Sequence, residues 1–224
     1  IEANRKSPDL IPAAVMAARG LVAKGDHKGA ARVVKKAWEG VAHPDLAAVF
    51  AEIEPDETPG ARLKRFKPLI AQHPDHDETK LLQAEMLIAA EDFPAARRAL
   101  SDLIDRHPTQ RALAIMAAIE RGEGADDAVV RGWLAKALVA PRGPQWCCDK
   151  CQAIHAEWHP ICTNCGSFDT LSWREPQESI AQSARGAELL PLLVQPAAKG
   201  EPAPQGSAAE PEVIDLAAVA RSAD

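Results

Sequence analysis

The five cysteines of this 224-residue chain all fall in one short window, and their spacing limits the fold more than any other feature. The window holds two Cys-x-x-Cys pairs, Cys148/Cys151 and Cys162/Cys165, with ten residues between them. Two such pairs place four thiolates at tetrahedral positions around one ion, and each pair binds it from one side. The spacing therefore predicts a metal site with these four ligands and leaves Cys147 as a spare thiol.

The residues beside the pairs bear on the ligand assignment. Gly166 follows the second pair, where a positive φ lets backbone N–H groups reach the sulfurs, and glycine adopts that φ without strain. Gln152 holds the corresponding place after the first pair and is less suited to it. An assignment with Cys147 in place of Cys148 would break the two-residue spacing, so we favour Cys148.

Other uses of the window can be compared with a metal site. His155 and His159 could replace a thiolate, but with four cysteines present they are predicted to be loop residues. Disulfides would suit an oxidising compartment, yet the paired spacing is that of a metal site, and no cysteine lies upstream to be bridged. A thioredoxin-like redox pair would need a βαβ context, which is absent. We predict Zn²⁺, with a rubredoxin-type iron as the alternative, because a tetrahedral S₄ site accepts either metal.

Large side chains gather in the same window, although the chain has only five Trp, four Phe and no Tyr. Because so few residues do not fold alone, these side chains are predicted to form a small hydrophobic shell that the metal completes. The predicted shell residues are Trp146, Trp158, Phe168, Leu171 and Trp173. Residues 144–175 are therefore predicted to form a metal-binding knuckle.

Upstream, residues 1–143 are rich in helix-forming Ala, Leu, Arg, Lys and Glu. A proline-containing motif recurs there as Ser7-Pro8-Asp9-Leu10, His43-Pro44-Asp45-Leu46, His73-Pro74-Asp75-His76 and His107-Pro108-Thr109-Gln110. The steps are 36, 30 and 34 residues, close to the period of tetratricopeptide helix pairs. The chain is thus predicted to be all-α, a tetratricopeptide-like solenoid followed by a rubredoxin-like zinc-ribbon knuckle.

About four helix pairs are predicted. The clearest, from Asp77 to Pro108, turns at Glu91-Asp92 and places Ala84, Ala96 and Leu100 where the repeat requires small, small and large side chains. Pairs are also expected near residues 11–38 and 111–139, the latter with Trp133 and Leu134 in the core. The pair near residues 46–72 is expected to be irregular, because Pro55, Pro59 and Gly60 interrupt it and Pro68 falls within its second helix.

Two features of the helical part resemble binding sites but have simpler interpretations. The basic cluster Arg62, Lys64, Arg65 and Lys67 is predicted to be a solvated helix face, opposite a buried stripe of Leu63, Phe66, Leu69 and Ile70. The histidines that precede prolines at the repeat boundaries are predicted to be turn residues rather than haem or metal ligands: His43, His73 and His107.

The formal charge of −6 lies mostly in the C-terminal tail, since residues 175–224 hold three basic and eight acidic side chains. This Pro- and Ala-rich composition buries little apolar surface, so residues 176–224 are predicted to be disordered. Two short apolar stretches interrupt the tail, Leu189–Val194 and Val213–Val219. The acidic balance argues against a nucleic-acid partner, which would require clustered basic residues.

The motifs together resemble a known family. Trp146-x-Cys148-Asp149-x-Cys151 and Ala156-Glu157-Trp158-x-Pro160-x-Cys162-x-x-Cys165-Gly166-x-Phe168-Asp169-Thr170-Leu171-x-Trp173, after tetratricopeptide-like helices, resemble the cytoplasmic part of HemY-type membrane proteins of alphaproteobacteria. That resemblance implies a haem-biosynthesis-associated scaffold or haem-handling factor, without a catalytic motif. It also implies a missing N-terminal anchor in the inner membrane, which agrees with a start at Ile1, with this part on the cytoplasmic side.

A looser likeness is to LapB-type proteins, which join tetratricopeptide repeats to a rubredoxin-like knuckle at a membrane and regulate lipopolysaccharide assembly. In those proteins the metal module packs against the repeats, and the same is expected here. The chain departs from the HemY-type pattern at Cys147, where an apolar residue is usual, and at Gln152 in place of glycine.

No nucleophile and base constellation is present, so the chain is predicted not to be an enzyme. We expect a scaffold with a structural zinc knuckle that binds a protein partner in the concave groove of its repeats. The alternatives are an iron-containing, rubredoxin-like electron-transfer or haem-handling protein and a LapB-like regulator of envelope assembly. No residue pattern supports haem itself as a ligand.

Overall fold

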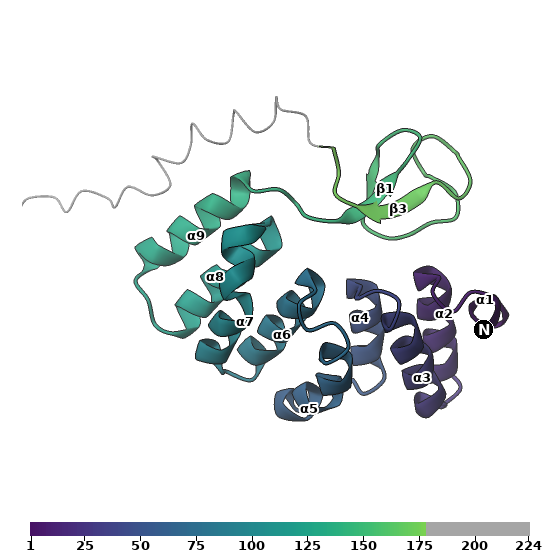
Figure 1. Ribbon diagram of the computed structural model, residues 1–224, viewed down its shortest axis with the longest axis horizontal. Helices are drawn as coiled ribbons and strands as arrows, with labels where there is room; N and C mark the ends of the chain where they lie inside the picture. The colour runs from purple at the N-terminus through teal and green to yellow at the C-terminus, as the bar shows by residue number, and fades with distance from the viewer. Residues whose placement is uncertain (178–224) are drawn as a thin grey trace, which may run out of the picture.

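The computed structural model describes residues 1–177, which form nine helices followed by a three-stranded sheet (Figure 1). The helices are α1 (Glu2–Lys6), α2 (Ile11–Val22), α3 (His27–Trp38), α4 (Pro44–Glu52), α5 (Pro59–Ile70), α6 (Asp77–Ala89), α7 (Phe93–Arg106), α8 (Gln110–Gly122) and α9 (Asp127–Val139); the strands are β1 (Gln145–Cys148), β2 (Ile154–His155) and β3 (Leu171–Arg174). The predicted disordered tail, with its two apolar stretches, lies outside the described residues except for positions 176 and 177.

The helices form a curved row, and the sheet lies near the end that contains α2 and α4 (Figure 1). After α9 the chain runs back across the row to reach β1 (Figure 1). None of the helices within residues 1–177 is long and apolar enough to cross a membrane.

One type of turn joins three of the helix pairs, α2/α3, α6/α7 and α8/α9. Its central residue has a positive φ, which is 76° at Gly25, 59° at Glu91 and 80° at Gly124. The N–H of the residue after it donates to the carbonyl of the residue five positions earlier than that donor, for example from Asp92 to Leu87 at 2.9 Å. This is the hydrogen-bond pattern by which a left-handed residue ends a helix.

The predicted helix pair from Asp77 to Pro108 is confirmed as α6 and α7. Ala84, Ala96 and Leu100 have no exposed surface, and they lie where the two helices and α8 pack together. The small side chains allow the close helix approach that the sequence pattern indicated.

The irregular pair is also confirmed. α4 packs mainly on α2, α3 and α6 instead of forming a tight pair with α5. The rings of Phe50 and Phe66 link α4 to α5 edge to face, with centroids 4.8 Å apart. Pro59 occupies the first turn of α5, where a missing N–H costs nothing, and the helix continues through Pro68.

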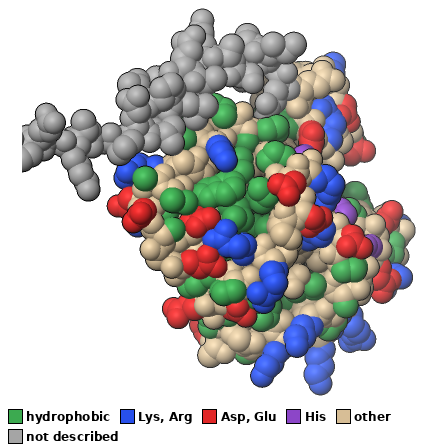
Figure 2. Space-filling view, turned by 60° about the vertical axis from the view of Figure 1, so that its left-hand side comes forward, with side chains coloured by type: hydrophobic (Ala, Val, Ile, Leu, Met, Phe, Trp, Pro, Cys, Tyr) green, Lys and Arg blue, Asp and Glu red, His purple; other side chains and the backbone are tan. Residues whose placement is uncertain are grey.

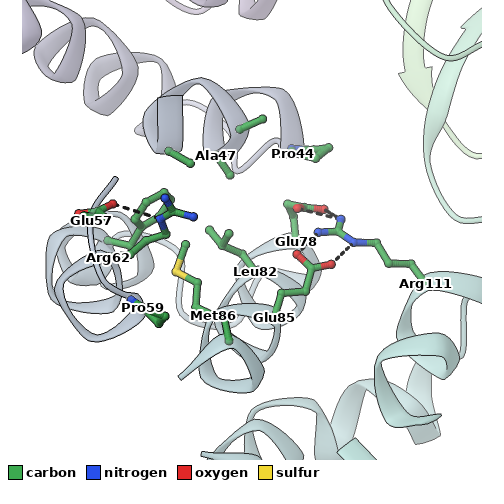
Figure 3. Close-up of a pocket in the computed structure, with 14 residues that line it drawn as sticks. Pro44, Ala47, Glu57, Pro59, Arg62, Glu78, Leu82, Glu85, Met86 and Arg111 are labelled. Carbon is green, nitrogen blue, oxygen red and sulfur yellow. Dashed lines mark hydrogen bonds and ion pairs between the residues drawn. The ribbon is translucent and has the colours of Figure 1, made fainter. Parts of the chain in front are cut away.

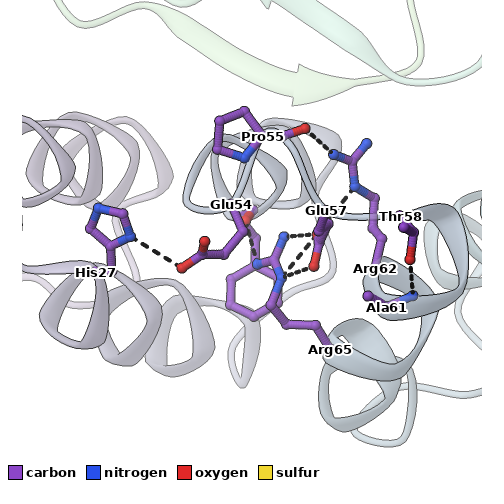
Figure 4. Close-up of polar contacts among 9 residues, drawn as sticks. His27, Glu54, Pro55, Glu57, Thr58, Ala61, Arg62 and Arg65 are labelled. Carbon is purple, nitrogen blue, oxygen red and sulfur yellow. Dashed lines mark hydrogen bonds and ion pairs between the residues drawn. The ribbon is translucent and has the colours of Figure 1, made fainter.

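The prediction of a solvated basic face on α5 is wrong for Arg62 and Arg65. Both donate to the carboxylate of Glu57 in the preceding loop, and Arg65 also donates to the Phe50 carbonyl at 2.6 Å (Figure 4). The Arg65 guanidinium lies 4.6 Å from the ring centroid of Phe50. The predicted buried stripe is confirmed for its two central members, because Phe66 and Leu69 have no exposed surface.

The last helix is less buried than the sequence indicated. Trp133 packs partly into the core of α6–α9, but Leu134 is 47% exposed, so its assignment to the core is wrong. Among the described elements α9 packs chiefly against α8, and its other face is therefore left open. On the side of the molecule where α8 and α9 lie, hydrophobic side chains gather within a border of charged ones (Figure 2).

Replacing Glu91 with glycine is expected to raise the free energy of unfolding by about 0.5–1 kcal/mol, because a side chain in the left-handed region is strained. Gly25→Ala places a Cβ in the equivalent turn, has open space around it, and should lower stability by about 1 kcal/mol. Urea unfolding monitored by circular dichroism measures both. A Glu91→Gly protein less stable than the parent would contradict the equivalence of the turns.

Candidate metal centre and groove

Each cysteine pair lies in a tight turn of the same form. The N–H of Gln152 donates to the Cys148 carbonyl at 2.9 Å, and the N–H of Gly166 donates to the Cys162 carbonyl at 2.8 Å. The φ values of Gln152 and Gly166 are 61° and 70°. The conformation expected of Gly166 is therefore present, and Gln152 adopts it despite its side chain.

The two turns bring the four predicted ligands together. The Sγ atoms of Cys148, Cys151, Cys162 and Cys165 all lie within 4.8 Å of one another. The pairs Cys148/Cys165 and Cys151/Cys162 are separated by 3.8 and 3.7 Å. A tetrahedral ion with bonds of about 2.3 Å to sulfur sets its ligands about 3.8 Å apart. The cluster thus has the donor set and the spacing to hold one metal ion such as zinc or iron.

Hydrogen bonds to the sulfurs favour thiolates in this cluster. The Thr170 hydroxyl, 3.2 Å from Cys148 Sγ, and the backbone N–H of Cys151 lower the pKa of Cys148 to about 6. The Ser167 hydroxyl lowers the pKa of Cys165. At Cys162 the backbone N–H of Cys165 acts in the same direction, but burial and the neighbouring sulfurs outweigh it and raise the pKa. The four groups cannot all ionise so close together unless a cation compensates them.

Cys147 stands apart from this cluster, as predicted. It lies in β1 beside Cys148, and successive strand residues point to opposite faces. Its thiol has no exposed surface and donates to the Arg174 carbonyl at 3.7 Å. Burial raises the pKa of Cys147, which keeps the spare thiol protonated.

The prediction that His155 is a loop residue is wrong, whereas His159 does lie in a loop. His155 belongs to β2, pairs with Trp146 of β1 and is 9% exposed. Its Nε2 lies 3.4 Å from Cys162 Sγ, and its Nδ1 lies 3.4 Å from the Thr163 hydroxyl. His155 is therefore placed to orient a ligand sulfur, although the four sulfurs surround the centre without it.

Replacing His155 with phenylalanine should weaken metal binding by about 10- to 100-fold, the usual effect of removing a hydrogen bond to a ligand. His159→Phe is the matched control. The centroid of the His159 ring lies 6.2 Å from that of His155, and His159 has no hydrogen bond to a sulfur in the described structure. Competition with a coloured zinc chelator measures both affinities. Equal affinities for the two variants would rule out this role.

The hydrophobic shell is confirmed in part. Trp146 and Leu171 are buried, and Trp158 and Trp173 pack on the same cluster. Phe168 is 74% exposed, so its assignment to the shell is wrong. It pairs with Ile161 in an isolated bridge, and both side chains face outward.

The knuckle docks on the start of α4 through His43, whose sequence context indicates only a turn residue. His43 is indeed the N-cap of α4, and its Nδ1 accepts from the Asp45 N–H at 3.1 Å. Its ring also has no exposed surface, with its centroid 4.3 Å from Trp173 and 5.3 Å from Trp146. The Trp146 indole donates to Asp45 at 3.2 Å. The knuckle therefore packs against the helices at the start of α4.

Burial determines the charge state of His43. It lowers the pKa to about 4, and the nearby carboxylate of Asp45 only partly opposes this effect. The imidazole is therefore neutral at pH 7, and protonation would place a charge between two indole rings.

A second contact ties the end of the knuckle to α7 and α6. His107 Nε2 lies 2.7 Å from the carboxylate of Glu175, and its Nδ1 lies 2.9 Å from that of Asp77. Asp77 is the main cause of a raised pKa at His107. His107 is the C-cap of α7 and His73 lies between α5 and α6, so both are turn residues as predicted.

A groove of about 430 Å³ runs between α4, the start of α5 and α6 (Figure 3). Its lining is mainly small or apolar and includes Pro44, Ala47, Ala48, Ala51, Pro59, Phe66, Leu82, Met86 and Ala89. Charged side chains stand at both ends, Glu57 with Arg62 at one and Glu78 and Glu85 with Arg111 at the other. Such a surface suits an apolar segment with polar flanks.

Together the fold and the cluster define a mostly helical protein with a C-terminal four-cysteine site able to hold a metal ion. Comparison with known proteins adds no relative. No protein-family model matches the sequence, and no curated protein matches it.

Proposed function

We propose that this chain is a non-enzymatic scaffold that binds a segment of a partner protein in the groove between α4, α5 and α6. The observation that carries this proposal is the groove itself, a continuous apolar lining that ends in fixed charges. Ordered charges around an apolar centre are the usual composition of a protein-binding surface.

The helices are proposed to be tetratricopeptide-like repeats. The shared turn supports this, because Glu91 lies 66 residues after Gly25 and Gly124 a further 33, two repeat steps and then one. The irregular α4/α5 pair occupies the missing step, and its opening creates the groove.

The metal is proposed to be a structural Zn²⁺ that keeps the knuckle folded against His43. Four thiolates and no open coordination position are typical of structural zinc sites. A second candidate is a rubredoxin-like iron that transfers electrons, which is favoured by the exposed sulfur edge at Cys165. The absorption spectrum separates them, because a zinc protein is colourless and redox-silent.

The proposed setting is the cytoplasmic side of the inner membrane, with an anchor upstream of Ile1 and an association with haem biosynthesis. This setting rests on the resemblance of the cysteine-window motif to HemY-type proteins. A LapB-like role in envelope assembly is the alternative, and haem binding is tested by titration.

A groove-blocking substitution tests the function. A partner recovered by cross-linking in cells should be lost with Ala48→Trp, since Ala48 is an exposed residue of the groove. It should be retained with Ala128→Trp, because Ala128 is an exposed residue of α9 outside the groove. A partner set unaffected by Ala48→Trp, or turnover of a small substrate by the purified chain, would contradict the proposal.

A further inference from the structure

The two ends of the groove carry opposite net charges. At the α5 end one carboxylate, Glu57, accepts from two guanidinium groups, Arg62 at 3.2 Å and Arg65 at 2.9 Å (Figure 4). The Glu57 side chain is 11% exposed, whereas that of Arg62 is 33% exposed and lines the groove. This end therefore presents one uncompensated positive charge.

At the other end the ratio of guanidinium groups to carboxylates is reversed, because one guanidinium donates to two carboxylates. Arg111 of α8 donates to Glu78 at 2.8 Å and to Glu85 at 2.8 Å, both on α6 (Figure 3). These bonds engage the Nε, Nη1 and Nη2 atoms of Arg111. The Glu85 side chain is 41% exposed, so the surplus negative charge is open to the groove.

The charge at this end of the groove depends on pH through Glu78. Burial is the main cause that raises its pKa to about 7, Glu85 adds to the rise, and Arg111 only partly offsets it. Above pH 7 both carboxylates are ionised against a single guanidinium. A cationic side chain from a partner would complete the pairing.

Between the charged ends, the small side chains that line the groove allow the backbone of a bound segment to approach closely. Ala47 of α4 faces Leu82 and Met86 of α6 across the groove (Figure 3), and Ala48 and Ala51 of α4 also line it. Small residues on one wall and larger apolar residues on the other suit alternating apolar side chains. Charges at the two ends then fix the direction of the bound segment, since the reversed segment would meet like charges.

We propose that the groove binds an apolar segment of a partner protein in one direction only, with a basic side chain at the Glu85 end and an acidic side chain at the Arg62 end. This inference rests on the proposed function, because it names the kind of segment that the scaffold recognises. The charge order distinguishes such a partner from a purely apolar one.

A library of random twelve-residue peptides displayed on phage tests the inference. It is selected at pH 8 against the full, zinc-loaded chain, after removal of peptides that bind the Ala48→Trp variant. Enriched peptides should have an apolar centre with Lys or Arg on one side and Asp or Glu on the other, always in the same order.

Variants then assign each charge to an end of the groove. Glu85→Gln leaves Arg111 paired with Glu78 alone, and it should weaken an enriched peptide about 3- to 10-fold, an effect that disappears when the basic residue of the peptide is replaced. Arg62→Gln should also weaken the enriched peptide about 3- to 10-fold, and this effect should disappear when the acidic residue of the peptide is replaced. Lys64→Gln is the control, since Lys64 is exposed on the same helix but does not line the groove.

The outcomes separate the inference from the function on which it rests. Groove-binding peptides without a fixed charge order, or peptides indifferent to Glu85→Gln and Arg62→Gln, would overturn the inference and leave the scaffold intact. Peptides that match residues 178–224 would indicate that the groove binds the chain's own C-terminal sequence, and they would overturn the proposal of a separate partner protein. If no enriched peptide is sensitive to Ala48→Trp, both proposals fail.

Discussion

Replacing Cys162 with serine is expected to abolish metal binding and to unfold residues 146–173 while α1–α9 stay folded. The hydrophobic cluster of the knuckle has only four buried members, and two of them are the proposed ligands Cys148 and Cys162, so the knuckle depends on the ion for its stability. Metal binding contributes on the order of 10 kcal/mol or more to small sites of this kind, and three thiolates do not replace four. Hydrogen exchange followed by mass spectrometry should show rapid exchange over 146–173 and unchanged protection in α6–α8.

The matched control for this experiment is Cys147→Ala. Cys147 lies next to a ligand but points away from the cluster, so this variant should retain the metal and the protected knuckle. Unchanged metal content in Cys162→Ser, or loss of metal in Cys147→Ala, would show that the ligand assignment is wrong.

The second large effect is expected in the pH dependence of stability, and it comes from His43. Its pKa is about 4 in the folded protein and 6.5, the ordinary value for histidine, in the unfolded chain, so the unfolded state binds more protons between these values. Its contribution to stability is therefore complete above pH 6.5 and falls as the pH falls. Between pH 7.5 and 5 the loss is about 2 kcal/mol.

Glu78 acts in the opposite direction over the same range. Its pKa is raised to about 7 in the folded protein from 4.5, so the folded state binds more protons and acidification is stabilising. The two effects oppose each other in the parent protein, so its own pH profile does not isolate the contribution of His43.

His43→Asn separates the two contributions. Asparagine preserves the N-cap but does not titrate, so this variant should gain about 2 kcal/mol relative to the parent on going from pH 7.5 to 5, whatever its stability at neutral pH. Urea unfolding with excess zinc measures the profiles, and parallel profiles for His43→Asn and the parent would contradict a buried neutral His43.

The features that could be predicted from the sequence are those fixed by local spacing. The two cysteine pairs set the sulfur cluster, and the positive φ of Gly166 follows from the geometry of the turn. The turn at Glu91 and the packing of Ala84, Ala96 and Leu100 follow from helical periodicity and repeat spacing. In each case the determinants lie within a few residues of one another or recur at a fixed step.

The features that escaped prediction depend on contacts between distant segments. His43 packs against Trp146 and Trp173, which lie 103 and 130 residues further along the chain, so its local Pro-Asp context could indicate only a turn. Arg65 is drawn from solvent by Glu57 and by the ring of Phe50 on another helix. Phe168 was assigned to the shell by composition, but the register of its bridge with Ile161 turns it outward.

The central claim is that four cysteines, and no histidine, hold one metal ion in the knuckle. X-ray absorption spectroscopy of the full chain loaded with one equivalent of zinc tests it most directly. The predicted result is four sulfur neighbours at about 2.3 Å. A nitrogen neighbour at about 2.0 Å, or fewer than four sulfurs, would contradict the claim and identify His155 or His159 as a ligand.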